Sequence, residues 1–333
     1  MDPILVLPLL LASSFDDPTG HWHSPLTENL RWSIDQSARV IVDDDGDAAT
    51  LAFFGLDLHT VWSTNSRDVA TFTLQPYLTR VDGLEPTPPL FDGPDDWELV
   101  WRIFNGNFKL RDDGALNLRV GHFEVPFGLE HTINTNGTLR DYTHGANFGL
   151  KADWGATLNG DLPEFEYELG WSRGSGNEYD DEGDPGVFSG RIGTPRDEDL
   201  VLGLSVADGD FLSPAGVVER SRFGVDAQWY WRSYGLFGEV SGGDAPGGVE
   251  TWRALAEVNW RDPHETVLGW AQVVVDRRDM VSDVEHASEA RIGVRWVPSA
   301  GWSLSAQLAQ PLDPALDTGS RAGRLAIQLR YRF

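Results

Sequence analysis

The last ten residues of the chain, 324–333, alternate without a break between two kinds of side chain. One parity carries the apolar and aromatic groups Leu325, Ile327, Leu329, Tyr331 and Phe333. The other parity carries three arginines, an alanine and a glutamine. A period of two predicts a β-strand, and these two faces suit a sheet with lipid on one side and water on the other. They do not suit a strand in a soluble core.

Similar alternating segments recur at intervals of about 18 to 20 residues along the chain. Each has about the 9 to 11 residues that a tilted membrane strand needs. The pattern predicts an all-β fold, a transmembrane antiparallel β-barrel of about sixteen strands. The expected strands are 30–42, 50–62, 69–81, 97–110, 115–125, 147–159, 164–173, 186–194, 199–207, 220–232, 234–242, 250–261, 265–275, 288–297, 302–310 and 323–333.

The alternation assigns a face to each residue of these strands. In 147–159 the residues expected to face outward are Phe148, Leu150, Ala152, Trp154, Ala156 and Leu158. The pattern is weak in 30–42, 186–194 and 265–275, so the strand count stays open.

The connections between the predicted strands alternate in length, as expected for outer-membrane barrels with short periplasmic turns and longer external loops. The short connections include 111–114, 159–161, 261–264 and 297–300, and they are rich in turn-forming residues. The long connections are 83–96, 126–146, 174–185, 208–219, 276–287 and 311–320. With sixteen strands, both chain ends fall on the periplasmic side. A soluble β-sandwich or propeller does not predict such alternation.

The start of the chain predicts export. Residues 4–12 form an apolar run of about signal-peptide length, followed by the small residues Ala12, Ser13 and Ser14. We expect residues 1–14 to be a signal peptide, 15–29 a short periplasmic segment and 30–333 the barrel. A buried N-terminal strand is the alternative for residues 4–12. The absence of cysteine among 333 residues is compatible with a secreted chain.

The composition excludes some partners. The formal net charge of −26 argues against binding to nucleic acid. Aromatic residues cluster near the predicted strand ends and could form the two interfacial girdles of a membrane barrel; packing in a soluble core or stacking on sugars is the alternative. They are Trp62, Trp97, Trp101, Tyr167, Trp171, Trp229, Trp231, Trp252, Trp260 and Trp302. Tyr77, Tyr230 and Phe237 have inward parity but are scattered along the sequence.

Residues 118–130 read LRVGHFEVPFGLE. This stretch resembles the phosphate-selective porin O and P family of Gram-negative outer membranes, whose members carry a similar strand and a Pro-Phe-Gly-Leu-Glu start to the third external loop. The final strand, with its terminal aromatic residue, is similar to the assembly signal of bacterial outer-membrane barrels. The resemblance implies residence in the cell outer membrane, contact with its lipid, and a homotrimer.

In that family the third external loop folds into the barrel and narrows the channel. The resemblance therefore implies that loop 126–146 is a constriction loop. It also implies that His144, Asn134 and Asn136 lie near the constriction. The residues assigned to the constriction loop are Pro126, Phe127, Gly128, Glu130, His131, Arg140 and Asp141.

Strand parity also predicts which charges face the lumen. The basic residues expected to line the pore are Arg102, Arg119, Lys151, Arg191, Arg222, Arg232, Arg253, Arg261, Arg291, Arg295, Arg324, Arg330 and Arg332. The inward acidic residues are Asp57, Glu98, Asp153, Glu166, Glu168, Asp226, Glu239 and Glu257. The basic set is larger, so the wall favours anions although the whole chain is acidic. Alternatively, the arginines pair with carboxylates across strands and make the barrel rigid.

These features predict a porin, a water-filled channel for passive diffusion of small hydrophilic solutes with a mild anion preference that extends to phosphate. The alternative is a structural or adhesive barrel with a plugged lumen. The chain has only two lysines, whereas phosphate-selective members resemble one another in lysine- and arginine-rich constrictions.

No catalytic residue, metal site or cofactor is expected. The eight histidines lie in unpatterned contexts, and no serine stands in a nucleophile elbow. The run Asp43, Asp45 and Asp47 lacks the glycine and glutamate of a calcium-binding frame, so solvated loops are the preferred interpretation.

Overall fold

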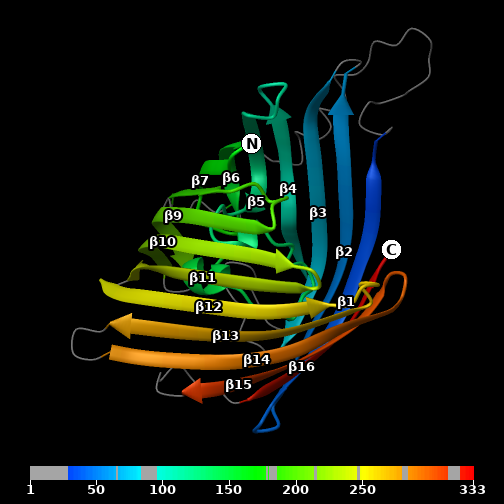
Figure 1. The fold of residues 1–333 in the computed structure, drawn as a ribbon, viewed down its shortest axis with the longest axis vertical. Coiled ribbons are helices and arrows are strands. Elements are labelled where there is room, and N and C mark those ends of the chain that lie inside the picture. The colour runs from blue at the N-terminus through cyan, green and yellow to red at the C-terminus, as the bar shows by residue number, and fades with distance from the viewer. Residues whose placement is uncertain are drawn as a thin grey trace.

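Sixteen antiparallel strands close into one barrel in the computed structural model of the chain (Figure 1). Each strand pairs with its neighbours in sequence, and the first strand pairs with the last. The structure describes residues 29–64, 67–83, 96–177, 179, 186–213, 216–245, 248–279, 284–313 and 323–333. The predicted signal peptide and all of segment 15–29 except Asn29 lie outside the described residues.

The sequence prediction of a sixteen-stranded antiparallel barrel is confirmed, and each predicted strand has a counterpart. The strands are β1 (Arg31–Asp43), β2 (Ala48–Ser63), β3 (Asp68–Asp82), β4 (Glu98–Lys109), β5 (Asn117–Glu124), β6 (Ala152–Asp161), β7 (Glu166–Ser172), β8 (Val187–Gly193), β9 (Leu200–Ser213), β10 (Gly216–Trp231), β11 (Tyr234–Ala245), β12 (Val249–Arg261), β13 (Val267–Asp279), β14 (Val284–Ser299), β15 (Trp302–Asp313) and β16 (Arg324–Arg332).

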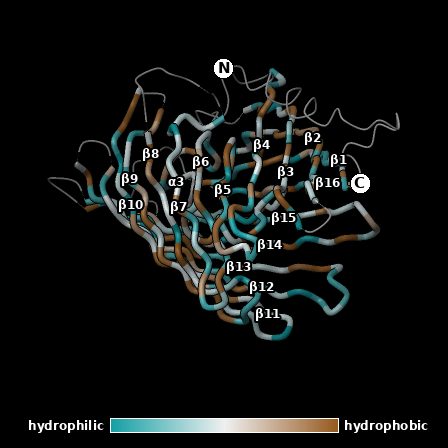
Figure 2. The backbone as a smooth tube through the Cα atoms, turned by 90° about the horizontal axis from the view of Figure 1, so that it is seen from above, coloured by the Kyte–Doolittle hydropathy of each residue, from teal (hydrophilic) through white to brown (hydrophobic). Residues whose placement is uncertain are grey.

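The alternation of side chains separates an apolar outer face from a more polar inner face. In β9, Leu202 and Leu204 are exposed on the outside, whereas Val201 and Ser205 are buried inside. In β16, Leu325, Ile327 and Leu329 are exposed, and the residues between them are buried. Figure 2 shows this as alternating brown and teal along the strands. The barrel thus exposes apolar side chains outward and collects polar groups inside.

The three segments with weak alternation are real strands, β1, β8 and β13. In the first half of β13 the inner face is itself apolar, because Leu268 and Trp270 are buried under Leu139 from a distant loop. In β1 the inner face carries Asp35 and Arg39, while apolar Val40 and Val42 are exposed. The weak pattern in β13 therefore reflects packing inside the lumen.

Several sequence predictions about where strands begin and end are wrong. The predicted strand 147–159 begins only at Ala152, and Phe148 and Leu150 pack inside the protein instead of facing outward. The predicted loops 208–219 and 276–287 consist largely of strand, because β9, β10, β13 and β14 extend further than their apolar pattern. The turn expected at 159–161 lies at 162–165, since β6 runs to Asp161.

The connections lie alternately at two ends of the barrel. We call one end the short-turn end; it carries the connections 110–116, 162–165, 194–199, 232–233, 262–266 and 300–301. We call the opposite end the long-loop end; it carries the connections between β5 and β6, 125–151, and between β7 and β8. The predicted alternation in length fails at 44–47, which is short although it lies at the long-loop end, and between β9 and β10, where Gly216 already pairs with Ser213. Predicted loop residues 84–95, 180–185 and 314–320 lie outside the described residues.

Helical structure in the described residues consists of the 3-10 turn η2 (Leu129–His131) and the short helix α3 (His144–Phe148). Both belong to the connection between β5 and β6. No helix in the described part of the chain is long and apolar enough to cross a bilayer.

Side chains of β1 and β16 tie the two ends of the sheet together. Arg330 Nε donates to Asp35 Oδ1 at 2.7 Å, and its Nη2 donates to Asp35 Oδ2. Arg332 donates to Asp57 of β2 at 2.7 Å. The backbones of Ile34 and Phe333 exchange two hydrogen bonds of 3.0 Å. Asp35 is fully buried, so this seam contains an ion pair away from solvent.

We expect Asp35→Ala to destabilise the barrel, because removal of one partner from a buried ion pair costs about 3–5 kcal/mol. The measurement is urea unfolding of the refolded protein in detergent micelles, followed by tryptophan fluorescence. Arg67→Gln is the matched control, because Arg67 and Asp112 form a solvent-exposed pair, which is worth about 1 kcal/mol or less. Equal unfolding midpoints for the two variants would contradict the assigned role of the seam.

Candidate pore constriction

The connection between β5 and β6, residues 125–151, contains the predicted constriction loop 126–146. It enters the barrel and packs against its inner face, and we call the whole connection the constriction loop. Its two ends meet in one apolar cluster. The ring centroids of Phe127 and Phe148 lie 5.0 Å apart, and Phe148 stacks on Phe211 of β9 with a centroid distance of 5.4 Å. The other buried members of this cluster are Leu150, Val187 of β8, Val125 and Ala207. The apolar residues predicted to face lipid at the start of β6 instead close the base of this constriction loop.

The Pro-Phe-Gly-Leu-Glu motif fixes the loop where it leaves β5. Pro126, Phe127, Gly128 and Glu130 are all buried. The N–H of Gly128 donates to Ser205 Oγ at 3.0 Å, and the N–H of the next residue donates to Glu239 at 2.8 Å. Gly128 has a positive φ of 57°, and a Cβ there would collide with the Glu239 carboxylate. The motif thus seats the backbone directly on wall residues of β9 and β11.

Glu257 of β12 holds the middle of the loop. It accepts hydrogen bonds from Arg140 Nη1 at 3.0 Å, from the Tyr142 hydroxyl at 3.1 Å and from Gln272 at 2.9 Å. Burial raises the pKa of Tyr142 well above its ordinary value, so the phenol stays protonated and donates.

The far part of the loop reaches the seam of the barrel. Arg330 Nη1 donates to the carbonyl oxygen of Asn136 at 2.7 Å, and Gln328 donates to that of Gly137 at 2.6 Å. Arg39 of β1 donates to the carbonyl oxygen of Thr138 at 3.0 Å. The loop therefore spans the lumen from β5 and β6 to β1 and β16.

Most of the basic residues predicted to line the pore form ion pairs with carboxylates. Within the wall and its turns the pairs are Arg102–Glu124, Arg119–Glu168, Arg191–Asp226, Arg253–Asp276, Arg261–Glu265, Arg291–Glu289, Arg324–Glu289, Arg330–Asp35 and Arg332–Asp57. Lys151 lies 3.6 Å from Glu124, and Arg291 also pairs with Asp141 of the constriction loop at 2.8 Å. Most of these pairs join two different strands or the loop and the wall, as in the alternative interpretation of the basic wall, whereas Arg291–Glu289 lies within β14 and Arg261–Glu265 joins the end of β12 to its turn.

Other arginines have no carboxylate within ion-pair distance among the described residues. Arg222 donates to the carbonyl oxygens of Ser221 and Asp244, and the buried Nε of Arg295 has no hydrogen-bond partner in the described part of the chain. Arg232 was predicted to lie on the strand wall, but it lies in the turn between β10 and β11, with φ of 55° and its guanidinium over the Trp231 ring.

Parity missed several charged residues of the lumen. Arg220 shares the inner face of β10 with Arg222. The two residues are two positions apart in the predicted strand, so their common parity was a signal for Arg220. Asp35 and Arg39 escaped because β1 alternates weakly. Asp276 and Arg278 lie at the extended end of β13, in a stretch predicted to be mostly loop.

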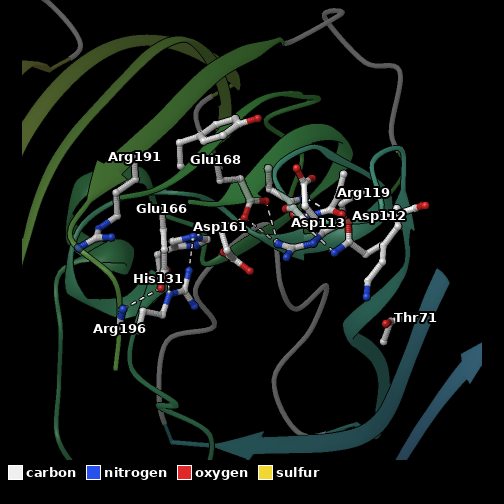
Figure 3. A pocket seen from close by; sticks show the side chains of 16 residues that line it. Thr71, Asp112, Asp113, Arg119, His131, Asp161, Glu166, Glu168, Arg191 and Arg196 are labelled. Carbon is white, nitrogen blue, oxygen red and sulfur yellow. Dashed lines mark hydrogen bonds and ion pairs between the residues drawn. The ribbon is translucent and has the colours of Figure 1, made fainter. Parts of the chain in front are cut away.

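A cavity of about 500 Å³ remains between the constriction loop and the wall of β3 to β8, at the short-turn end. Figure 3 shows its lining. Arg119 donates to Glu168 at 2.8 Å, and His131 of the loop lies 3.4 Å from the same carboxylate. Arg196 binds Glu166 at 2.7 Å and contacts His131 at 3.1 Å. This lining is hydrophilic, with both signs of charge.

The inner face also brings Tyr230 and Phe237 together, with ring centroids 5.5 Å apart. Tyr77 lies elsewhere and donates to Asp35 and Asp57. Two of the three scattered inward aromatics are therefore neighbours. Among the described residues, no group of three or more histidine, aspartate or glutamate side chains is arranged to hold a metal ion.

Solved structures resemble this fold across most of the chain. OmpT of Vibrio cholerae in its trimer form matches with a TM-score of 0.64 at 11% identity, covering 91% of this chain and 99% of that one. The anion-selective porin from Comamonas acidovorans matches at 0.65 and 11%, covering 91% and 99%. OprB of Pseudomonas putida matches at 0.66 and 12%, covering 92% and 94%. No family model and no curated protein sequence matches the chain.

We expect Glu257→Ala to release the middle of the constriction loop, because Arg140, Tyr142 and Gln272 all lose their acceptor. An uncompensated buried arginine costs about 3–5 kcal/mol, so this segment should become accessible. Limited trypsin digestion of the refolded protein, read by mass spectrometry, should show cleavage after Arg140 at least about tenfold faster than in the parent chain. A tenfold change corresponds to less free energy than the loss of the buried partner. Glu265→Ala, which removes the partner of exposed Arg261, should leave that rate unchanged; slow cleavage in both variants would contradict the anchoring role.

Proposed function

We propose that this chain is an outer-membrane porin that lets small hydrophilic solutes diffuse passively through a water-filled lumen, with a mild preference for anions. The observation that carries the proposal is a closed barrel with an apolar, exposed outer face and a polar inner face, crossed by an inserted loop. A closed barrel leaves no unpaired strand edge in lipid. The anion-selective porin among the similar structures supports the same class of function.

Residence in the outer membrane is supported by the outer surface. The apolar side chains of Leu204 and Ile292, for example, are 59% and 63% exposed. Exposure of such apolar surface to water is unfavourable, and contact with lipid removes that free-energy cost. Aromatic residues are exposed near strand ends, including Trp171, Trp231 and Trp302, as in the girdles of membrane barrels. The apolar run near the N-terminus is consistent with export.

The anion preference is supported by arginines of the lumen that form no ion pair with a carboxylate among the described residues. Carboxylates such as Asp226 and Glu257 are engaged by arginines, so they contribute little net field. Arg39, Arg222 and Arg295 hydrogen-bond at most to neutral groups among the described residues. Fixed positive charge in a narrow pore raises the local concentration of anions. The mixture of signs supports a mild preference for anions, phosphate included, rather than tight phosphate specificity.

The many contacts of the constriction loop favour a second candidate, a structural or adhesive barrel with a plugged lumen. The loop binds residues of β1, β12, β14 and β16, so little free cross-section is left near the seam. The cavity beside β3 to β8 supports passage on the opposite side. A homotrimer is a further part of the proposal, supported by the trimer form of one similar structure.

The deciding measurement is the insertion of refolded protein into planar bilayers. A porin should produce discrete, stepwise conductance, and a chloride-selective reversal potential in a potassium chloride gradient. Absence of steps would favour the plugged barrel, and a potassium-selective potential would contradict the charge assignment. Chemical cross-linking in detergent should yield a species of three chains.

Arg295→Glu should shift the reversal potential toward potassium, because it reverses an unpaired charge in the lumen and Coulomb energies are large at short range in a narrow pore. Arg67→Glu at an exposed turn is the matched control, with an equal change in net charge. Equal shifts in the two variants would mean that total charge, rather than lumen charge, sets selectivity.

A further inference from the structure

A second cavity, of about 530 Å³, opens at the long-loop end between the constriction loop and the inner faces of β10 to β13. Its charged lining is almost entirely basic. The charged residues are Arg220, Arg222, Arg253, Asp276, Arg277 and Arg278. The lining also includes the small or apolar residues Ala245, Val249 and Thr251. We call this cavity the arginine pocket.

The strand register sorts the arginines into two groups on either side of an uncharged floor. Arg220 and Arg222 lie two residues apart on β10, and both line the cavity. On the other side, Arg278 of β13 is in register with Thr251 of β12, and Arg253 is in register with Asp276. Strands lie about 4.8 Å apart, so β10 and β13 are separated by about 14 Å.

Between the two groups, β11 and β12 contribute the uncharged lining residues Ala245, Val249, Thr251 and Trp252. Ala245 of β11 pairs with Val249 of β12, and Gly243 pairs with Thr251. Gly243 lies directly beside Arg222: its φ is 148°, and a Cβ there would lie 3.1 Å from the Arg222 Cα and against the Ser221 carbonyl oxygen. An elongated molecule could lie on this floor with one end near each arginine group.

The guanidinium groups have donors left over. Arg222 donates only to carbonyl oxygens, and Arg220 donates to the carbonyl oxygen of Asn147 at 3.2 Å. Arginines that lack carboxylates are suited to bind an anion from outside, often with two parallel hydrogen bonds.

Nearby acids reduce this charge only in part. Asp276 pairs with Arg253 at 3.0 Å, and Arg277 is neutralised by Asp279 at 2.7 Å. Glu285 is in register with Arg278, although no ion pair joins them in the structure. Asp244, whose carbonyl oxygen accepts from Arg222, adds one more carboxylate near the first group. Arg220, Arg222 and Arg278 have no carboxylate within ion-pair distance among the described residues, and two of them lie on one side of the floor and one on the other.

We infer that the arginine pocket is a binding site for short dicarboxylates or similar anions with an acid group at each end. One carboxylate binds Arg220 and Arg222, the other binds Arg278, and the carbon chain lies over Ala245, Val249 and Thr251. A compact anion such as sulfate cannot engage both groups across three strand spacings. This inference deepens the proposed anion preference and rests on it for the route by which the solute arrives.

The test is equilibrium binding to the refolded protein in detergent, measured by calorimetry with succinate, butyrate and sulfate at equal ionic strength. Succinate and butyrate have the same carbon count but two acid groups against one. Succinate should bind at least about tenfold more tightly than butyrate and sulfate, since each charge-assisted contact is worth about a decade or more in affinity. Equal binding of succinate and butyrate, or tighter binding of sulfate, would overturn the two-ended site.

Variants separate the two ends. Arg222→Gln and Arg278→Gln should each weaken succinate binding by about tenfold. Butyrate has one carboxylate and engages one arginine group, so only one of the two variants should weaken its binding. Arg232→Gln, in a turn at the opposite end of the barrel, is the matched control and should bind succinate as the parent does. Arg222→Lys and Arg278→Lys serve if a glutamine variant fails to fold, because they keep the charge but lose the two-pronged donor; unchanged succinate affinity in the folded variants would overturn the site.

Binding and conduction fail independently in this design. A chain that binds succinate in micelles but produces no conductance steps in bilayers retains the arginine pocket and loses the porin function. A chain that conducts chloride but does not distinguish succinate from butyrate retains the porin function and loses the pocket.

Discussion

Closure of β1 against β16 is the constraint on which the rest of the structure depends. Only a closed sheet leaves no row of unpaired backbone groups, and only a closed sheet has an interior. Arg330 joins this closure to the constriction, because one guanidinium donates to Asp35 of β1 and to Asn136 of the inserted loop. The seam and the far end of the loop therefore share one buried charge.

The interior satisfies its charges largely within itself. Taking an ion from water into a protein interior is costly, and the cost is recovered only where a partner and further hydrogen bonds are present. Asp226 with Arg191 and Glu257 with Arg140 meet this condition. Such pairs make the wall rigid, but they cancel the field that would select ions. A long list of inward basic residues therefore overstates the positive charge of the lumen. In the proposed porin, selectivity would depend on the arginines without carboxylates and on carboxylates such as Asp153, which accepts from backbone N–H groups.

Sequence periodicity was sufficient for the barrel because the outer face is apolar in nearly every strand, a local signal with a period of two. It failed where apolar residues served the interior. Phe148 and Leu150 continue the parity of β6, yet they pack inward on Phe211, and Trp270 faces inward beneath Leu139. These contacts join residues that are tens to more than a hundred positions apart, so no local pattern contains them. The pairing of lumen charges depends on strand register in the same way, and register across sixteen strands cannot be read from one sequence.

The glycines of the constriction loop show how the loop and the wall depend on each other. Gly128 stands where a Cβ would collide with the Glu239 carboxylate, and Gly137 where it would collide with the Arg330 guanidinium, and both have a positive φ. At these two points the wall contributes a charged side chain and the loop contributes bare backbone. The Leu129 N–H donates to Glu239, which also accepts from the Thr143 hydroxyl, and the Asn136 carbonyl oxygen accepts from Arg330, which also binds Asp35. A larger loop residue at either position would have to displace a buried charge. The path of the loop is therefore set by the positions of the wall charges that bind its backbone.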